Sequence, residues 1–246
     1  MDKSLFYTTA LAVMDGERAA GGIGTLGEKA LHAILKRYFE PDVSKHEIKV
    51  GRYVADIRND AGITEIQTRQ FGVMRKKLEY FLQENTVTVV YPVAQVKWLT
   101  WMNTKTGETA EKRRSPKAGR PQEIFAELYR IRPLLLSDNL HFCIVMLEMQ
   151  ELRHFDGMSR GRRKNPERCD RYPSELCGEI EINGPGDYRQ LIPAGLPQPF
   201  TSRDFGAACG IPRSLAQTAL NVLSFTGTVR RTGKKGNAFL YTTSPF

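Results

Sequence analysis

The spacing of hydrophobic positions changes several times along this chain, and each change marks a predicted element. Two segments repeat apolar residues about every three or four positions, as helices with one buried face do, and short apolar runs bounded by turn residues lie between and after them. In chain order the pattern predicts a helix, three strands, a helix and a strand, at Gly24–Phe39, His46–Val50, Tyr53–Arg58, Ile63–Thr68, Phe71–Glu84 and Val87–Pro92. The second helix has its apolar face at Phe71, Met74, Leu78 and Phe81. The basic residues 75–77 are therefore expected to face solvent.

Beyond residue 93 the same patterns predict a hairpin, a helix, a strand and a linker. The hairpin joins Ala94–Asn103 to Glu108–Ser115 through a Lys-Thr-Gly turn. A helix is expected from Pro121 to Leu136, because proline suits the first turn, and a buried strand at Leu140–Glu148. Residues 186–199 are rich in proline and glycine, a composition typical of a linker.

The C-terminal residues predict two helices and then a second β-hairpin. The short helix begins at Thr201 and ends at Gly210, a favourable residue at a helix C-terminus, and the longer helix begins at Pro212. Two β runs follow at Thr228–Arg231 and Ala238–Thr242. This order of elements resembles that of a winged helix-turn-helix domain.

The winged-helix resemblance covers about residues 198–244 and implies how the chain is divided. It implies a large domain at 1–185, a linker at 186–199 and a small α+β domain at 200–246. In such domains the second helix enters the major groove and the wing lies near the backbone. The residues that would contact DNA are Arg213, Ser214, Gln217, Thr218, Asn221, Arg230, Arg231, Lys234 and Lys235. Winged helices also serve in protein contacts, and that alternative stays open.

Two acidic residues are predicted to meet near the start of the chain's first sheet. Side chains alternate along a strand, so Glu65 and Gln67 leave one face while Ile66 enters the opposite layer. A tight turn at Asn59–Gly62 would bring Asp56 beside Glu65 on that face. Two close carboxylates repel unless they are protonated or bridged by a cation such as Mg²⁺. The alternatives are that Asp56 caps the turn and that Glu65 is a solvated strand residue.

These residues resemble the PD-(D/E)XK nuclease superfamily, which includes many restriction enzymes. Its motif places an aspartate at one strand end and (D/E)-x-K on the next strand, here Asp56 and Glu65-Ile66-Gln67. The resemblance covers about residues 20–95 and implies the αβββαβ core of that superfamily, with a mixed sheet. The sequence departs from the motif at Gln67, where the family has lysine. An amide cannot act as a base, although some restriction enzymes of the superfamily carry glutamine there.

The resemblance implies metal-assisted hydrolysis of a phosphodiester bond. Mg²⁺, with Mn²⁺ able to replace it, would be held by Asp56, Glu65 and the backbone carbonyl of Ile66, and Gln67 would orient the attacking water. Glu28 stands where relatives place an outer glutamate, although Thr25–Glu28 also matches the pattern of a capping box. In some relatives a basic residue of the following helix replaces the missing lysine, so residues 76 and 77 are candidates beside their interpretation as a solvated face.

Composition supports a polyanionic partner. The chain has 246 residues, a formal net charge of +9 and a hydrophobic content of 41%, sufficient for a packed core. Clustered lysine and arginine favour nucleic acid through counterion release. The basic run Lys112, Arg113 and Arg114 in the first hairpin is either a clamp on the DNA backbone or a solvated loop. Apolar stretches are too short to span a bilayer and Leu5–Met14 is too polar for a signal peptide, so we expect a cytoplasmic protein, nucleoid-associated in a prokaryote.

The sequence therefore predicts an α/β protein that is a Mg²⁺-dependent DNA endonuclease targeted to double-stranded DNA by a winged helix. One active site cuts one strand, so double-strand cleavage would need a homodimer or two sequential nicks. The main alternative is a non-catalytic DNA-binding regulator or scaffold with a degenerate nuclease fold, which Gln67 favours. A nuclease that acts on RNA is a third hypothesis.

Overall fold

The structure is a computed structural model that describes residues 1–19, 28–103, 106–155 and 168–244. The α-helices are α1 (Lys3–Ala19), α2 (Glu28–Phe39), α3 (Phe71–Phe81), α4 (Phe125–Leu128), α5 (Ser202–Cys209) and α6 (Arg213–Phe225). The 3-10 helices are η1 (Val43–Lys45), η2 (Pro121–Ile124), η3 (Tyr129–Leu136) and η4 (Pro185–Leu191). Within the described ranges, no helix has the length and apolar character needed to cross a membrane.

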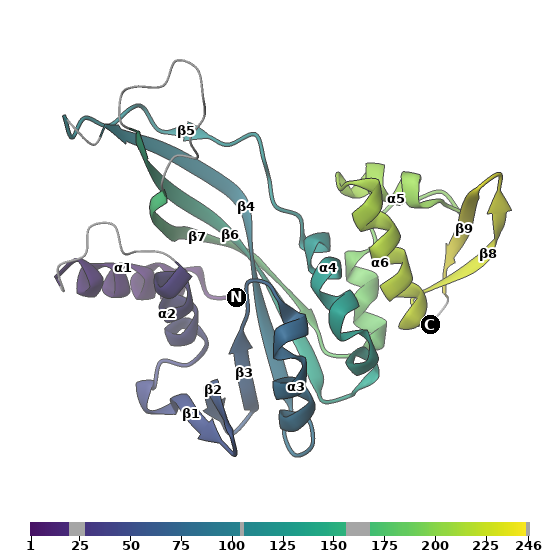
Figure 1. The fold of residues 1–246 in the computed structure, drawn as a ribbon, viewed down its shortest axis with the longest axis horizontal. Helices are drawn as coiled ribbons and strands as arrows, with labels where there is room; N and C mark the ends of the chain where they lie inside the picture. Colours follow the sequence, from purple (N-terminus) through teal and green to yellow (C-terminus); the bar gives the residue numbers. More distant parts are fainter. Residues whose placement is uncertain (20–27, 104–105, 156–167, 245–246) are drawn as a thin grey trace. The chain divides into compact units, whose positions relative to one another are not determined.

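The strands of the described part form one mixed sheet and one separate hairpin (Figure 1). The strands are β1 (His46–Val50), β2 (Tyr53–Asn59), β3 (Gly62–Ile66), β4 (Val87–Asn103), β5 (Arg113–Arg114), β6 (Leu140–Phe155), β7 (Arg168–Ile182), β8 (Val229–Lys235) and β9 (Ala238–Thr243). Seven of them pair in the order β1-β2-β3-β4-β6-β7, with β5 beside β4, and β8 pairs with β9. The predicted α/β class is confirmed, and α2, β1, β2, β3, α3 and β4 follow the predicted order of elements.

The chain divides into two compact units, and the long strands contribute residues to both. The first unit comprises residues 1–46, 94–119 and 146–178, and includes α1 and α2. The second comprises residues 47–93, 120–145 and 179–246. The strands β2, β3 and the start of β4, with helices α3 to α6, therefore belong to one unit, which contains most of the predicted site.

The second unit is organised around α3, which connects the parallel strands β3 and β4. Its predicted apolar face is confirmed, because Phe71, Met74, Leu78 and Phe81 are all buried. The ring of Phe71 lies 5.7 Å from that of Tyr91 on β4, edge to face. Burial of this face fixes which of the remaining α3 side chains approach the sheet.

The predicted helix from Pro121 to Leu136 is confirmed in part, because the segment is helical but is not one regular α-helix. This segment is broken into η2, α4 and η3, and Ile131 has non-helical dihedral angles, with φ −115° and ψ 17°. Pro133 lacks the backbone N–H that would continue the helical ladder, and in a regular α-helix its ring would clash with a preceding carbonyl. Apolar residues of the segment are nevertheless buried, including Phe125, Leu128 and Ile131.

The C-terminal elements follow the predicted order closely. Helix α5 begins with a capping box between Thr201 and Asp204 and ends at Gly210, which has a left-handed φ of 65°. In α6 the predicted core residues Ala219, Leu220 and Leu223 are buried. Leu215 is only half-buried, and the remaining core positions of α6 belong to Ala216 and Val222.

Other parts of the chain were not anticipated. Helix α1 and strand β7 were not predicted. In the stretch predicted to be a linker, η4 forms and buries Tyr188 and Leu191. The division into domains at 186–199 stays a prediction.

Candidate functional site

A hairpin between β2 and β3 brings Asp56 and Glu65 together, as the alternation of side chains predicts. Ile57 pairs with Thr64 and Asn59 with Gly62, so Asp56 stands opposite Glu65 in the next step of the ladder. Gly62 has φ 122°, and a Cβ there would lie 2.3 Å from the Thr86 carbonyl oxygen, so this turn requires glycine.

Hydrogen bonds to the backbone hold both carboxylates in place. The backbone N–H of Ile66 donates to Asp56 Oδ2 at 2.8 Å. The backbone N–H of Asp56 donates to Glu65 Oε1 at 3.3 Å. Each acid is therefore oriented by the strand that carries the other, which excludes the interpretation of Asp56 as a turn cap alone.

Glu65 is the buried member of the pair. Its side chain is 3% exposed, so it is not a solvated strand residue. Burial and the neighbouring Asp56 charge raise the pKa of Glu65 from 4.5 to about 7, while the Lys77 ammonium opposes that rise. Near neutral pH this carboxyl therefore exchanges between a protonated form and a form that attracts cations.

Lys77 of α3 completes the cluster, and the expectation that residue 77 faces solvent is wrong. Its Nζ lies 2.5 Å from Glu65 Oε2, and its side chain is 22% exposed. Lys77 follows Met74 by three positions and precedes Phe81 by four, which places it on the edge of the buried helix face. The spacing of Lys77 from Met74 and Phe81 could have indicated from sequence that Lys77 approaches the sheet. It could not identify Glu65 as the partner, because that depends on where α3 packs on the sheet.

Gln67 and Glu28 are placed differently from the two acids. The Gln67 backbone N–H donates to the Val90 carbonyl at 2.9 Å, and its side-chain Nε2 donates to the Arg69 carbonyl at 2.5 Å. Its amide thus bonds to the β3–α3 connection, and its predicted role in orienting water stays a prediction. Glu28 begins α2, but its side chain and residues 20–27 lie outside the described part of the chain.

The acidic pair has the donor chemistry that Mg²⁺ prefers. Among the described residues no three His, Cys, Asp or Glu side chains gather around one point, so a closed cage of the zinc type is not formed there. Mg²⁺ keeps several waters and is usually bound by only one or two carboxylates. Asp56 and Glu65 supply two carboxylates of this kind, and the participation of the Ile66 backbone carbonyl stays a prediction.

The predicted DNA-contacting residues of α6 are mostly accessible. Arg213, Ser214 and Gln217 are exposed, while Thr218 is half-buried and donates its hydroxyl to the Ser214 carbonyl at 3.1 Å. Asn221 is exposed, but its Oδ1 accepts a hydrogen bond of 2.6 Å from Arg132 Nη1.

The β8–β9 hairpin presents its basic residues to solvent. Arg230, Arg231, Lys234 and Lys235 are all exposed. The guanidinium of Arg231 lies 3.5 Å from the centre of the Phe239 ring, and the ammonium of Lys234 lies 4.8 Å from it. These cation–π contacts orient the two side chains along one face of the hairpin.

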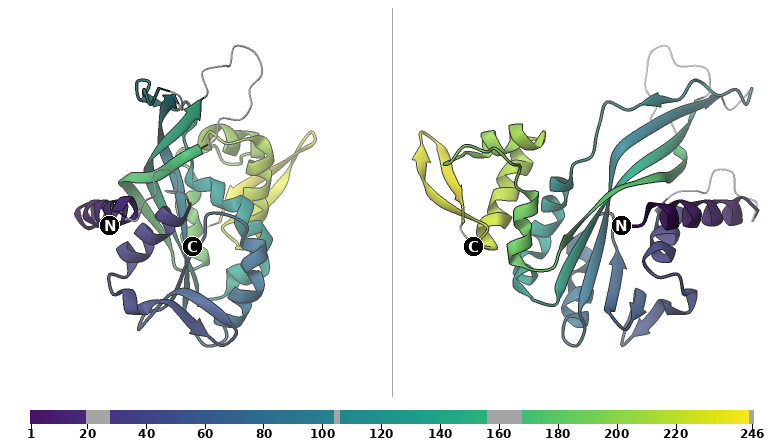
Figure 2. Two further views of the ribbon diagram at one scale, coloured as in Figure 1. Left: turned by 60° about the vertical axis from the view of Figure 1, so that its left-hand side comes forward. Right: turned by 180° about the vertical axis from the view of Figure 1, so that it is seen from behind.

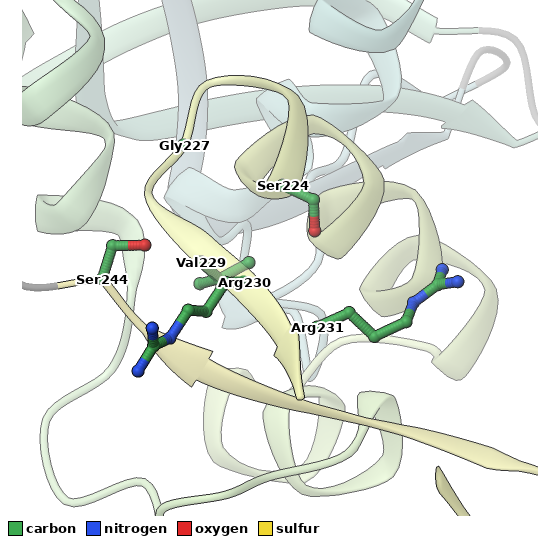
Figure 3. Close-up of a pocket in the computed structure, with 6 residues that line it drawn as sticks. All are labelled: Ser224, Gly227, Val229, Arg230, Arg231 and Ser244. Atoms are coloured by element: carbon green, nitrogen blue, oxygen red, sulfur yellow. The ribbon is translucent and has the colours of Figure 1, made fainter. Parts of the chain in front are cut away.

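An open pocket lies where α6 meets this hairpin. Its volume is about 470 Å³, and Figure 3 shows its lining residues, Ser224, Gly227, Val229, Arg230, Arg231 and Ser244. The side chains of Arg230 and Arg231 point in different directions (Figure 3). Because the last carbonyls of α6 carry partial negative charge, cations beside them also have a structural reason to be there. The pocket alone therefore defines no ligand.

The basic arm of the first hairpin lies in the other unit. The bridge between Met102 and Thr109 and the pairing of β5 with β4 support the predicted hairpin. Lys112, Arg113 and Arg114 are exposed. The Lys112 ammonium lies 4.9 Å from the centre of the Trp98 ring, so aromatic contacts orient this basic arm.

Fold and cluster together define a mixed α/β protein with an Asp–Glu–Lys cluster, in which Glu65 is buried, and with two basic surfaces. The chain belongs to the family described as Domain of unknown function (DUF8091), which matches residues 29–183. An "Uncharacterized protein" of Treponema pallidum (strain Nichols) is 30% identical over 225 residues, which are 91% of this chain and 88% of that protein. No solved structure matches the chain.

Proposed function

We propose that this protein is a metal-dependent DNA endonuclease, with a PD-(D/E)XK-type core and a C-terminal winged helix-turn-helix. The observation that carries the proposal is the Asp56–Glu65 pair with Lys77 bound to Glu65. Burying Glu65 beside a second acid is costly, because a buried charge loses its hydration, and the ion pair with Lys77 offsets this cost only in part. Such an arrangement is typical of active sites, where pKa values are shifted for chemistry.

The residues of the cluster have separable roles in this proposal. Asp56, Glu65 and the Ile66 carbonyl would hold Mg²⁺ or Mn²⁺, which when bound acidifies a water and stabilises charge on the phosphate. Lys77 supplies the cationic group that Gln67 cannot supply at the family's lysine position. Its ammonium lowers the pKa of Glu65 against the effect of burial, which keeps the carboxylate available at neutral pH.

DNA as the substrate is supported by charge and by the C-terminal elements. The net charge of +9 and the exposed basic residues of β8 suit a phosphate backbone. Helix α6 presents Arg213, Ser214 and Gln217 on one accessible side, and these side chains can bond to base edges. Cleavage of both strands would require two copies of the site, so a homodimer belongs to the proposal.

One observation favours the second candidate, a DNA-binding scaffold without catalytic activity. Gln67 replaces the family's lysine, and its side-chain amide bonds to the Arg69 carbonyl. In a scaffold the Lys77–Glu65 ion pair would simply neutralise a buried acid. The two candidates differ in whether a divalent ion binds between the acids.

Cleavage of supercoiled plasmid with Mg²⁺ or Mn²⁺ separates the two candidates. The variants are Asp56→Asn and Glu65→Gln, each of which keeps a hydrogen-bond acceptor, with Asp60→Asn in the exposed hairpin turn as matched control. Nicking by the wild type and the control, lost in both site variants, supports the endonuclease. If all four proteins bind DNA in a salt-sensitive manner and none cuts any substrate, the scaffold is correct.

A further inference from the structure

Arg132 of η3 makes two side-chain contacts with the C-terminal half of α6 and one with its own helix. Its Nη1 donates to Asn221 Oδ1 at 2.6 Å. Its guanidinium also lies 5.1 Å from the centre of the Phe225 ring and 5.6 Å from that of Tyr129. The two views of Figure 2 show α4 and η3 running beside α6, and all three elements belong to one compact unit. Arg132 therefore packs against two aromatic rings and directs one donor at Asn221.

This contact determines how the amide of Asn221 is oriented. Arginine has only donors, so the atom that it contacts must be the amide oxygen. The NH₂ group of Asn221 then points away from Arg132. Asn221 is exposed and lies four residues after Gln217 and three before Ser224, which are also exposed. The NH₂ group therefore belongs to the same accessible stripe of α6 as these side chains.

We propose that Arg132 is a positioning residue for DNA recognition, which holds Asn221 so that α6 offers an N–H donor to a base edge. The inference rests on the proposed function, because it requires that α6 lie in the major groove. Asparagine recognises adenine by accepting from N6 and donating to N7 at once. Here a charged donor engages the oxygen, and charge-assisted hydrogen bonds are the stronger kind. The base pair that faces Asn221 is then recognised through acceptors, which guanine presents twice, at N7 and O6.

A purely structural role for Arg132 makes a different prediction. If Arg132 only attaches η3 to α6, its loss lowers stability and leaves base preference unchanged. If it orients Asn221, its loss changes the preference at one base pair and leaves the others as they were. Substitution of Arg132 by methionine removes the guanidinium but keeps an aliphatic side chain in contact with the two rings.

The test is sequence selection from randomised duplex DNA with the full-length protein, followed by equilibrium binding to the selected site. The variants are Arg132→Met and Asn221→Ala. The matched control is Arg130→Met, because Arg130 is exposed and its substitution removes the same charge from the same helix, η3. We expect wild type and control to prefer guanine at one base pair by at least about fivefold over adenine. Asn221→Ala should lose that preference, and Arg132→Met should reduce or reverse it at the same pair.

A readout without DNA separates this inference from the proposed function. The side-chain NH₂ signals of Asn221, assigned by their absence in Asn221→Ala, should shift in Arg132→Met and stay unchanged in Arg130→Met. If the wild type does not bind DNA, the proposed function fails and this inference fails with it. If the wild type binds DNA, and either shows no base preference or keeps the same preference in Arg132→Met, only the role of Arg132 is overturned.

Discussion

The ammonium of Lys77 lies 2.5 Å from Oε2 of Glu65, while the other oxygen of that carboxylate accepts the backbone N–H of Asp56. The cation comes from α3, although the strand that carries Glu65 offers glutamine two positions further on. A positive charge beside the acids is thus supplied from a neighbouring element. The ion pair between Lys77 and Glu65 therefore influences the pH at which Glu65 loses its proton.

Replacing Lys77 by methionine should move the pH dependence of the cluster upward. Burial and the Asp56 charge would still raise the pKa of Glu65, but the opposing ammonium would be gone. The pKa of Glu65 should then rise above about 7. A protonated carboxyl cannot hold a divalent ion. The measurement is the rate of Mg²⁺-dependent cleavage between about pH 6 and pH 9.

Lys76→Met is the control for this prediction, because Lys76 is exposed on the same helix and carries the same charge. Its pH profile should coincide with that of the wild type. Coincident profiles for Lys77→Met and wild type would show that Lys77 does not influence the acid that titrates.

Glu65→Gln should change how stability depends on pH. The folded-state pKa of Glu65, about 7, lies above its ordinary value of 4.5, so between these values the folded protein binds the proton more tightly than the unfolded chain does. The contribution of Glu65 to the free energy of unfolding is therefore fully present below about pH 4.5 and is lost as the pH rises through about 7. The complete loss is on the order of 3 kcal/mol. Urea unfolding at pH 5 and pH 8 should show a smaller decline in Glu65→Gln than in the wild type, and equal declines would contradict the raised pKa.

The acidic pair was predictable from sequence because it depends on local geometry. Strand alternation and a glycine turn place Asp56 opposite Glu65 within one hairpin, and the helical period identified the buried face of α3. The contact of Lys77 with Glu65 depends on how α3 packs on the sheet, which the helical period does not specify. The bond between Arg132 and Asn221 joins residues 89 positions apart, and the break at Ile131 comes from a proline inside an otherwise helical pattern.

Glu127→Ala should weaken the start of α3. The backbone N–H of Phe71 donates to Glu127 Oε2 at 2.9 Å, whereas Gln70, at the N-cap, makes no capping bond with its own side chain. A negative group at a helix N-terminus also interacts favourably with the helix dipole. Losing this cap should cost about 1 kcal/mol and accelerate hydrogen exchange at the Phe71 amide. Glu127→Gln keeps an acceptor and should have a smaller effect, so equal exchange in all three proteins would contradict the cap.

Lys234→Gln should weaken DNA binding without changing its sequence preference. Lys234 is exposed on the β8–β9 hairpin, where the proposed function places it near phosphates. Each lost phosphate contact reduces the slope of log affinity against log salt by about 0.9, because fewer counterions are released on binding. The measurement is affinity for one duplex at several salt concentrations, with Lys3→Gln as control, since Lys3 is also exposed and pairs with Glu175. The control should keep the wild-type slope. A slope lowered equally by both substitutions would mean that net charge, and not a contact at the hairpin, governs binding.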